Sequence, residues 1–119
     1  MKKVLAAAFL ATLTTTALAA NWVTDLGTQG VGVGVNLDTF DVRRAPGGEM
    51  VLIAEVKLSN ENVVRYHGVT VTDCRNGYGS VYYFINDTRD DWHFEFRGDA
   101  LGDFIARTIC NEGKRRGAY

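Results

Sequence analysis

The sequence predicts an α+β fold, in which an antiparallel sheet of about six strands carries one C-terminal helix packed on one face. Three observations indicate this. Several short segments alternate apolar and polar residues as strands do, only the stretch 99–112 has the period of an amphipathic helix, and the two cysteines, Cys74 and Cys110, lie far apart in the chain.

The first residues predict a secretory signal peptide at 1–19, followed by one domain at 20–113 and a basic tail at 114–119. Lys2 and Lys3 precede a short apolar run, and small residues occupy positions 17 and 19. The run is too short for a membrane span, and no lipid-attachment cysteine follows it. We therefore expect a periplasmic or secreted protein.

Charge argues against a polyanionic partner. Removal of the two leader lysines lowers the basic count from 13 to 11, against 14 acidic residues. The mature chain is thus slightly acidic, and no nucleic acid is expected to bind it.

The first strands are predicted before the single proline. Asn21–Gly30 indicates a short strand and a loop, and Val31–Leu37 and Thr39–Arg44 alternate as strands. Gly32 and Gly34 leave one strand face bare, which either admits a packed side chain or backbone or weakens an edge strand. A phosphate-binding loop does not fit, because no helix and no Lys-Ser/Thr pair follow.

The segment Glu49–Leu58 is the most hydrophobic and predicts a central strand that is partly buried on both faces. One face takes the helix, and a loop or a partner chain is expected on the other. Val63–Tyr66 can extend again. Gly68–Arg75 then alternates, with Cys74 on the side opposite the valines.

Asn76-Gly77 predicts a hairpin turn, with Tyr78–Ile85 as the returning strand. A polar loop follows. Trp92, Phe94 and Phe96 then alternate with polar residues in a last short strand before the helix.

The predicted helix begins after Asp99, a plausible N-cap, and ends at Gly113, a plausible C′ residue. One face carries an apolar stripe of Leu101, Phe104, Ile105, Thr108 and Ile109, and Asp103, Arg107 and Asn111 fall opposite. Cys110 lies in the last turn, where a disulfide to Cys74 would fasten the helix to the sheet. Closing this loop of roughly 36 residues contributes about 4 kcal/mol, and no redox role is expected.

No catalytic pattern is present, so we do not expect an enzyme or a cofactor. The carboxylates have no specifying spacing, and Ser59 and Ser80 lie outside any nucleophile-elbow sequence. Asp91, His93 and Glu95, at period 2, could bind a cation weakly, but an exposed polar strand face explains the same spacing better.

Two short motifs and a group of aromatic residues have ordinary structural explanations. Arg97-Gly98-Asp99 matches an adhesion tripeptide but fits a strand end and a helix N-cap better. The basic residues at 114–116 suit a solubilising tail that frays. The aromatics exceed what one helix face needs, so some are expected to contact a partner, although strand packing can absorb most of them. They are Tyr66, Tyr78, Tyr82, Tyr83, Phe84, Trp92, Phe94 and Phe96.

Taken in order, these segments resemble the surface-adhesin protein E-like domain family. The resemblance rests on Trp22, on Leu37–Arg44 before a glycine turn, on Asp73-Cys74-Arg75, on Trp92 and on the Gly98–Cys110 helix. It implies a small exported domain with an antiparallel sheet tied to a C-terminal helix by a disulfide, here Cys74 to Cys110. The family's namesake is a surface protein that binds host matrix and serum proteins and can dimerise.

The sequence thus favours an exported, non-enzymatic binding domain with a sheet face or an edge strand as its contact surface, and the resemblance implies an adhesin-like role. A protein partner and a homodimer are expected, and no binding residue is assigned. Two alternatives stay open: a small periplasmic metal-dependent protein or enzyme, and an inhibitor or immunity-type partner of another secreted protein.

Overall fold

A computed structural model describes residues 21–25, 31–45, 47–85, 88–95 and 100–119, with the backbone alone for 83–95. The chain forms, in order, β1 (Trp22–Asp25), β2 (Val33–Arg44), β3 (Met50–Leu58), β4 (Val64–Thr70), α2 (Val71–Asn76), β5 (Ser80–Ile85), β6 (Thr88–Glu95) and α3 (Ala100–Arg115).

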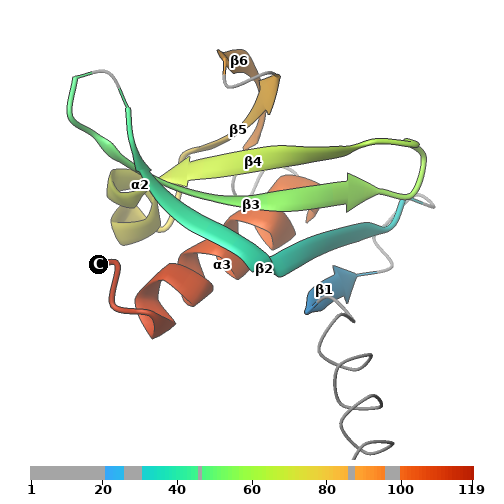
Figure 1. Ribbon diagram of the computed structural model, residues 1–119, viewed down its shortest axis with the longest axis horizontal. Coiled ribbons are helices and arrows are strands. Elements are labelled where there is room, and N and C mark those ends of the chain that lie inside the picture. The colour runs from blue at the N-terminus through green and yellow to red at the C-terminus, as the bar shows by residue number, and fades with distance from the viewer. Residues whose placement is uncertain (1–20, 26–30, 46, 86–87, 96–99) are drawn as a thin grey trace, which may run out of the picture.

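The six strands form one sheet in the order β1-β2-β3-β4-β5-β6, and every neighbouring pair is antiparallel. Helix α3 lies against one face and contacts β2 through β6, and α2 packs beside it at the end of β4 (Figure 1). The predicted fold class is confirmed, with β3 and β4 as the central strands.

Strand β2 joins the two segments predicted on either side of Asp38, and its register shifts between Asn36 and Asp41. The Thr39 hydroxyl occupies the irregularity: it donates to the Asn36 carbonyl (2.7 Å) and accepts from the Glu55 amide (2.8 Å). A side chain thus replaces the ladder bond that the bulge removes, so both strands stay hydrogen-bonded through the shift.

The bare glycine face of β2 admits a packed side chain, which was one of the two sequence alternatives. A Cβ added at Gly34 would lie 3.0 Å from Cε3 of Trp22, so the indole ring lies over this glycine. Because β1 has only four residues, this ring contact is a large part of what holds it to β2.

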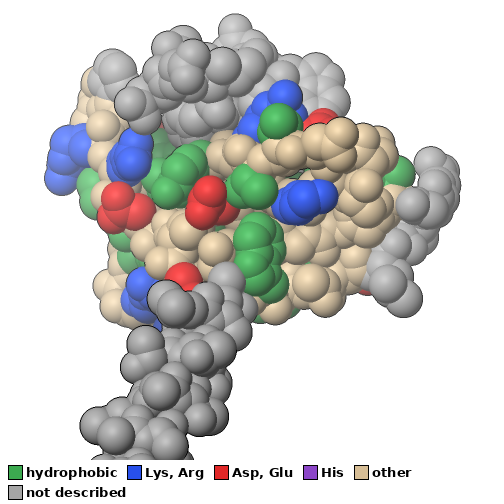
Figure 2. Space-filling model, turned by 45° about the vertical axis from the view of Figure 1, so that its right-hand side comes forward, with side chains coloured by type: hydrophobic (Ala, Val, Ile, Leu, Met, Phe, Trp, Pro, Cys, Tyr) green, Lys and Arg blue, Asp and Glu red, His purple; other side chains and the backbone are tan. Residues whose placement is uncertain are grey.

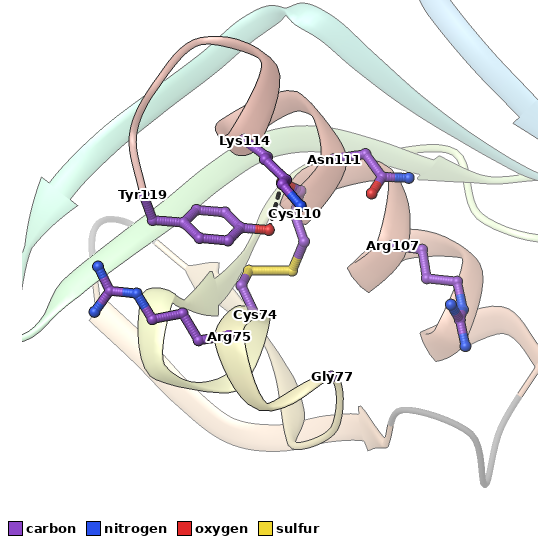
Figure 3. A pocket seen from close by; sticks show the side chains of 8 residues that line it. All are labelled: Cys74, Arg75, Gly77, Arg107, Cys110, Asn111, Lys114 and Tyr119. Atoms are coloured by element: carbon purple, nitrogen blue, oxygen red, sulfur yellow. Dashed lines mark hydrogen bonds between the residues drawn. A yellow bond between two sulfur atoms is a disulfide. The ribbon is translucent and has the colours of Figure 1, made fainter.

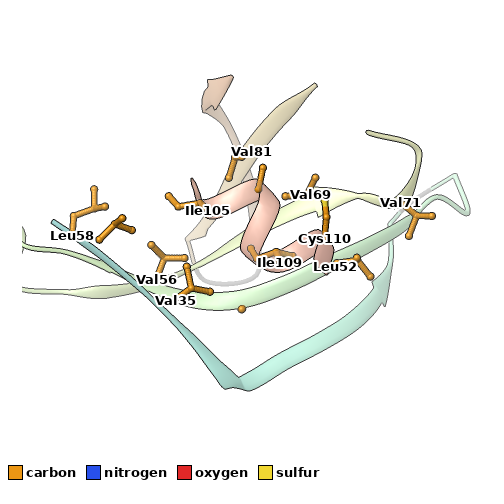
Figure 4. Close-up of a cluster of buried hydrophobic side chains, with 13 residues drawn as sticks. Val35, Leu52, Val56, Leu58, Val69, Val71, Val81, Ile105, Ile109 and Cys110 are labelled. Atoms are coloured by element: carbon orange, nitrogen blue, oxygen red, sulfur yellow. The ribbon is translucent and has the colours of Figure 1, made fainter. Parts of the chain in front are cut away.

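The core lies between the sheet and α3, and β3 is buried on both faces as predicted. Val35, Leu52, Val56, Val69 and Val81 meet the aliphatic face of α3 (Figure 4). On the other face Val51 and Ile53 are also buried, 4% and 2% exposed. The first half of β3 is therefore buried on both faces, whereas Lys57 near its end is exposed.

The buried face of α3 includes small residues that the predicted stripe omitted. Ile105 and Ile109 are fully buried as predicted, but Gly102, Ala106 and Gly113 are buried as well. Leu101, Phe104 and Thr108 are only half-buried at the margin. The small side chains let the helix axis come close to β3, and larger residues flank that contact.

The predicted helix end and tail are corrected. Helix α3 continues through Gly113 to Arg115 and ends before Gly117, whose φ of 78° is left-handed. The Ala118 amide donates to the Gly113 carbonyl (2.7 Å), which closes the last turn, and Tyr119 packs against the core. Residues 114–119 thus belong to the folded unit. Asp99 lies outside the described residues.

The predicted strand at 68–75 and the hairpin at Asn76-Gly77 are also wrong. The strand stops at Thr70, whose hydroxyl accepts from the Asp73 amide (3.1 Å) and caps α2. Gly77, at φ 76°, ends that helix instead of forming a hairpin turn. The helical turn rotates Cys74 to the core side, where it packs with the valines instead of opposite them.

The contact between Gly113 and Leu52 generates a stability prediction. A Cβ at Gly113 would lie 2.4 Å from Cδ1 of Leu52, and Leu52 is fully buried. We expect Gly113→Ala to lower the free energy of unfolding by about 1 kcal/mol, because overpacking outweighs the helix propensity that alanine gains. Urea denaturation measures this change.

The double-mutant cycle with Leu52→Ala is the control. Leu52→Ala alone should cost about 2 to 5 kcal/mol, but it makes room for the added methyl group. In that background Gly113→Ala should be neutral or stabilising. Equal effects of Gly113→Ala in both backgrounds would show that the close approach is not what selects glycine.

Candidate functional site

The two cysteines form the predicted disulfide, which joins α2 to α3. The Cα atoms of Cys74 and Cys110 are 5.4 Å apart, and the bond spans 36 residues. Thr70 starts α2 immediately after β4, and this brings Cys74 under the second half of α3. The described residues contain no free cysteine.

A surface hollow of about 440 Å³ lies beside the disulfide, along the seam between α2 and α3. Arg75 reaches it from α2, Arg107, Asn111 and Lys114 from α3, and Tyr119 from the C-terminal turn (Figure 3). The Tyr119 hydroxyl donates to the Cys110 carbonyl at 2.9 Å.

The hollow is cationic, and its three basic side chains differ in their pairing. Arg107 is paired with Asp103, with 2.8 Å between Nε and Oδ2. Among the described residues, neither Arg75 nor Lys114 has a carboxylate within ion-pair distance. No acidic residue lines the hollow in the described part of the chain.

The other basic residues at the end of α3 are neutralised. The buried carboxylate of Glu112 accepts from Arg115 (2.6 and 2.9 Å) and from Arg116 (2.6 Å). The Arg115 hydrogen bonds, followed by those of Arg116, lower the pKa of Glu112 to about 2, although burial opposes this. Arg116 also donates to the Leu37 carbonyl and lies over the Phe40 ring, so the cluster ties α3 to β2.

The sheet face opposite α3 carries no described helix. The register places Trp22 on β1, Arg43 on β2 and Tyr66 on β4 on this face. The Arg43 guanidinium lies 5.8 Å from the centroid of the Tyr66 ring, so the two side chains reach across β3 above its buried residues. Arg43 also forms an ion pair with Asp41, with 3.6 Å between its Nε and Oδ2 of the carboxylate.

Figure 2 shows hydrophobic side chains interspersed with charged ones over the view that it presents. Trp22 and Val64 are partly exposed, at 36% and 41%. We call the sheet face that points away from α3 the open face. It is defined by Trp22, Arg43, Val51, Ile53, Val64 and Tyr66.

His67 is buried on the helix side of β4, opposite Ala54. Its Nδ1 lies 3.2 Å from the Arg65 carbonyl, and because a carbonyl only accepts, Nδ1 carries the proton. Burial lowers the pKa of His67 to about 4, and the hydrogen bond to Arg65 opposes that shift. The ring is therefore neutral near pH 7.

The structure leaves the predicted cation site untested. Asp91, His93 and Glu95 lie on β6, where His93 pairs with Tyr82 and Glu95 with Ser80, but their side chains are outside the description. Within the described part of the chain, no cluster of three or more His, Cys, Asp or Glu residues could hold a metal ion. The Arg97-Gly98-Asp99 motif is not described.

Of the aromatic residues that were predicted to exceed what the helix face needs, three have described side chains. Tyr78 is 61% exposed after α2, Tyr66 is half-buried on the open face, and Tyr82 is half-buried on β5. The structure does not describe the side chains of Tyr83, Phe84, Trp92 and Phe94 on β5 and β6, and Phe96 is outside the described residues.

Sequence reasoning missed the hollow because it placed Cys74 and Arg75 on a strand. The pattern Thr70-Val71-Thr72-Asp73, a polar cap followed three residues later by an acid, was the signal that predicts a helix start there. With α2 in place, Arg75 falls in its last turn, beside α3.

Comparison with known proteins adds no relative: no family model, curated protein or solved structure matches this chain. The resemblance to the surface-adhesin protein E-like family therefore stays a prediction. Each helix that the structure describes is too short or too polar to cross a membrane.

Removal of the disulfide is expected to lower the free energy of unfolding by about 4 kcal/mol, because the unfolded chain regains the freedom of a long loop. The double variant Cys74→Ala and Cys110→Ala, compared with the oxidised protein in urea denaturation, measures this. Reduced wild-type protein is the control and should unfold at a similar midpoint. A loss below about 1 kcal/mol would mean that packing alone holds α2 and α3 together.

The buried histidine generates a pH prediction. His67 binds a proton with a pKa near 6.5 when unfolded but only near 4 when folded. Its contribution is therefore fully present above pH 6.5 and is lost as the pH falls toward 4. We expect the free energy of unfolding to drop by about 2 kcal/mol between pH 7 and pH 5.

Urea denaturation of His67→Gln and of the matched variant His93→Gln tests this assignment. The drop should disappear in His67→Gln and persist in His93→Gln. If His93→Gln removes the drop instead, the titrating group is not His67.

Proposed function

We propose that this chain is an exported, non-enzymatic interaction domain that binds another protein through the open face of its sheet. The observation that carries the proposal is that Val51 and Ile53 of β3 are buried on that face, although none of the described helices covers it. Arg43 and Tyr66 reach across the strand there, and no described helix lies over them.

The composition of the open face supports a protein partner. Trp22, Tyr66 and Arg43 belong to the residue types that carry most of the binding energy at protein interfaces. Trp22 and Arg43 keep part of their surface in solvent. A partner would complete the burial that these side chains begin.

The sheet edges offer a second way to contact a partner. Strand β1 is a short edge strand at one end of the sheet, and β6 lies at the other. An exposed edge can pair with an added strand, which includes the edge of a second copy of this chain. A homodimer is therefore part of the proposal.

The disulfide and the predicted signal peptide support the proposed compartment. A single disulfide between two helices suits an oxidising compartment, such as the periplasm or the exterior of the cell. The resemblance to the surface-adhesin protein E-like family adds the adhesin-like part of the proposal, the binding of host or envelope proteins.

The alternative functions have separate tests. A metal-dependent protein using Asp91, His93 and Glu95 would carry bound metal in elemental analysis and gain thermal stability with divalent ions. An inhibitor or immunity-type protein would capture one secreted protein from the same organism rather than host matrix proteins.

The test of the open face uses capture followed by rebinding. Immobilised mature chain is exposed to periplasmic extract and to host matrix proteins, and each captured protein is purified and its affinity measured. We expect the variant Trp22→Ser and Tyr66→Ser to weaken that affinity at least tenfold, because two aromatic anchors are removed.

The matched control is Tyr78→Ser, which removes an equally large aromatic side chain that is 61% exposed but outside the sheet. It should leave the affinity unchanged. Equal binding by the open-face variant, or loss of binding in Tyr78→Ser alone, would contradict the proposed surface.

A further inference from the structure

The hollow beside the disulfide carries positive charge in a chain whose formal net charge is −1. Arg75 from α2 and Arg107 and Lys114 from α3 line it, and Asp103 compensates only Arg107. About two positive charges are thus left at one place. Unpaired like charges held together repel each other, and an anion placed between them relieves that repulsion.

The basic residues next to the hollow are neutralised by an acidic residue, so the uncompensated charge is confined to the hollow. Arg115 and Arg116 follow Lys114 directly, and both are bound to Glu112. Lys114 has no such partner in the described part of the chain, and Arg75 in α2 has none either. Arg75 and Lys114 are therefore the lining cations left for a ligand.

The remaining lining fits an anion attached to a small organic body. Asn111 supplies a neutral amide that can donate a hydrogen bond. Because the Tyr119 hydroxyl donates its only proton to the Cys110 carbonyl, it has no donor left for an anion. The volume of about 440 Å³ lies within the range of small-molecule sites.

The charge selects the class of anion. A phosphate monoester carries about −1.5 to −2 at pH 7, which matches the two uncompensated cations, whereas a single carboxylate would neutralise only one. A guanidinium also binds two phosphate oxygens at once, and a lysine adds a point charge.

We propose that the hollow between α2 and α3 binds a phosphate monoester, with Arg75 and Lys114 as its charge partners and Asn111 as a neutral donor. The monoester comes from a soluble metabolite or from the headgroup of a lipid. The site is independent of the open face, because the two helices lie on the other side of the sheet.

The experiment titrates ¹⁵N-labelled protein with glycerol 3-phosphate and follows the backbone amides by NMR. We expect saturable shifts at residues 74–77 and 107–114, and weakening of binding at high salt. In a parallel arm, sedimentation compares vesicles of phosphatidylcholine with vesicles that also contain phosphatidic acid, whose headgroup is the same monoester.

Two double variants separate a site from general charge attraction. Arg75→Gln with Lys114→Gln should weaken binding at least tenfold. The control, Arg44→Gln with Lys57→Gln, removes the same charge from exposed side chains that donate to the backbone carbonyls of Gly48 and Glu61, and should leave affinity within about twofold. All four substitutions are on exposed residues, so both variants should give the wild-type fold by circular dichroism.

Every outcome of this experiment decides the proposal. Binding of glycerol 3-phosphate alone assigns a soluble ester, and binding of phosphatidic acid vesicles alone assigns a lipid headgroup; either supports the site if the hollow variant loses it. The proposal is overturned if neither probe binds, if shifts grow without saturation, or if the control variant loses as much affinity as the hollow variant.

Discussion

The close contact between α3 and β3 is the constraint on which the rest of the structure depends. Gly113 has no Cβ, and this lets the helix lie against the side chain of Leu52, which is fully buried. Gly102 and Ala106 continue the small surface along the same side of the helix. With these small residues turned toward β3, the direction of the other side chains of α3 is fixed. Cys110 faces α2, and Arg107, Asn111 and Lys114 line the hollow.

The distribution of charge at the end of α3 follows from the same geometry. Glu112 is directed into a buried position, where it takes Arg115 and Arg116 as partners and brings the latter to β2. Lys114, two positions after Glu112, lies on the other side of the helix and lines the hollow together with Arg75. Three consecutive basic residues thus have two different roles. Arg115 and Arg116 bind Glu112, and Lys114 lines the hollow beside the disulfide.

How much the sequence predicts depends on whether local pattern and tertiary contact agree. The helix through Ile105 and Ile109 was predictable because burial on one side imposes a helical period. The strand from Met50 to Leu58 was predictable because burial on both faces makes it almost continuously hydrophobic. The turn after Thr70 was not recognised, because the valine alternation continues past it while the capping hydroxyl starts a helix. Gly113 was misread for a similar reason: glycine commonly ends a helix, but here packing against Leu52 selects it inside one.

The sequence indicated what type of surface to expect but not where on the fold it would lie. Aromatic excess indicated a contact surface, but its location required the pairing of Trp22 with β2 and the reach of Arg43 to Tyr66, which no local pattern encodes. The hollow required two helices that are distant in sequence to meet, and one of them was predicted as a strand.

The bond between Cys74 and Cys110 also encloses β5, β6 and most of α3 in a covalent ring. A protease that cuts one peptide bond between residues 75 and 109 would produce two fragments that remain a single molecule until the sulfurs are reduced.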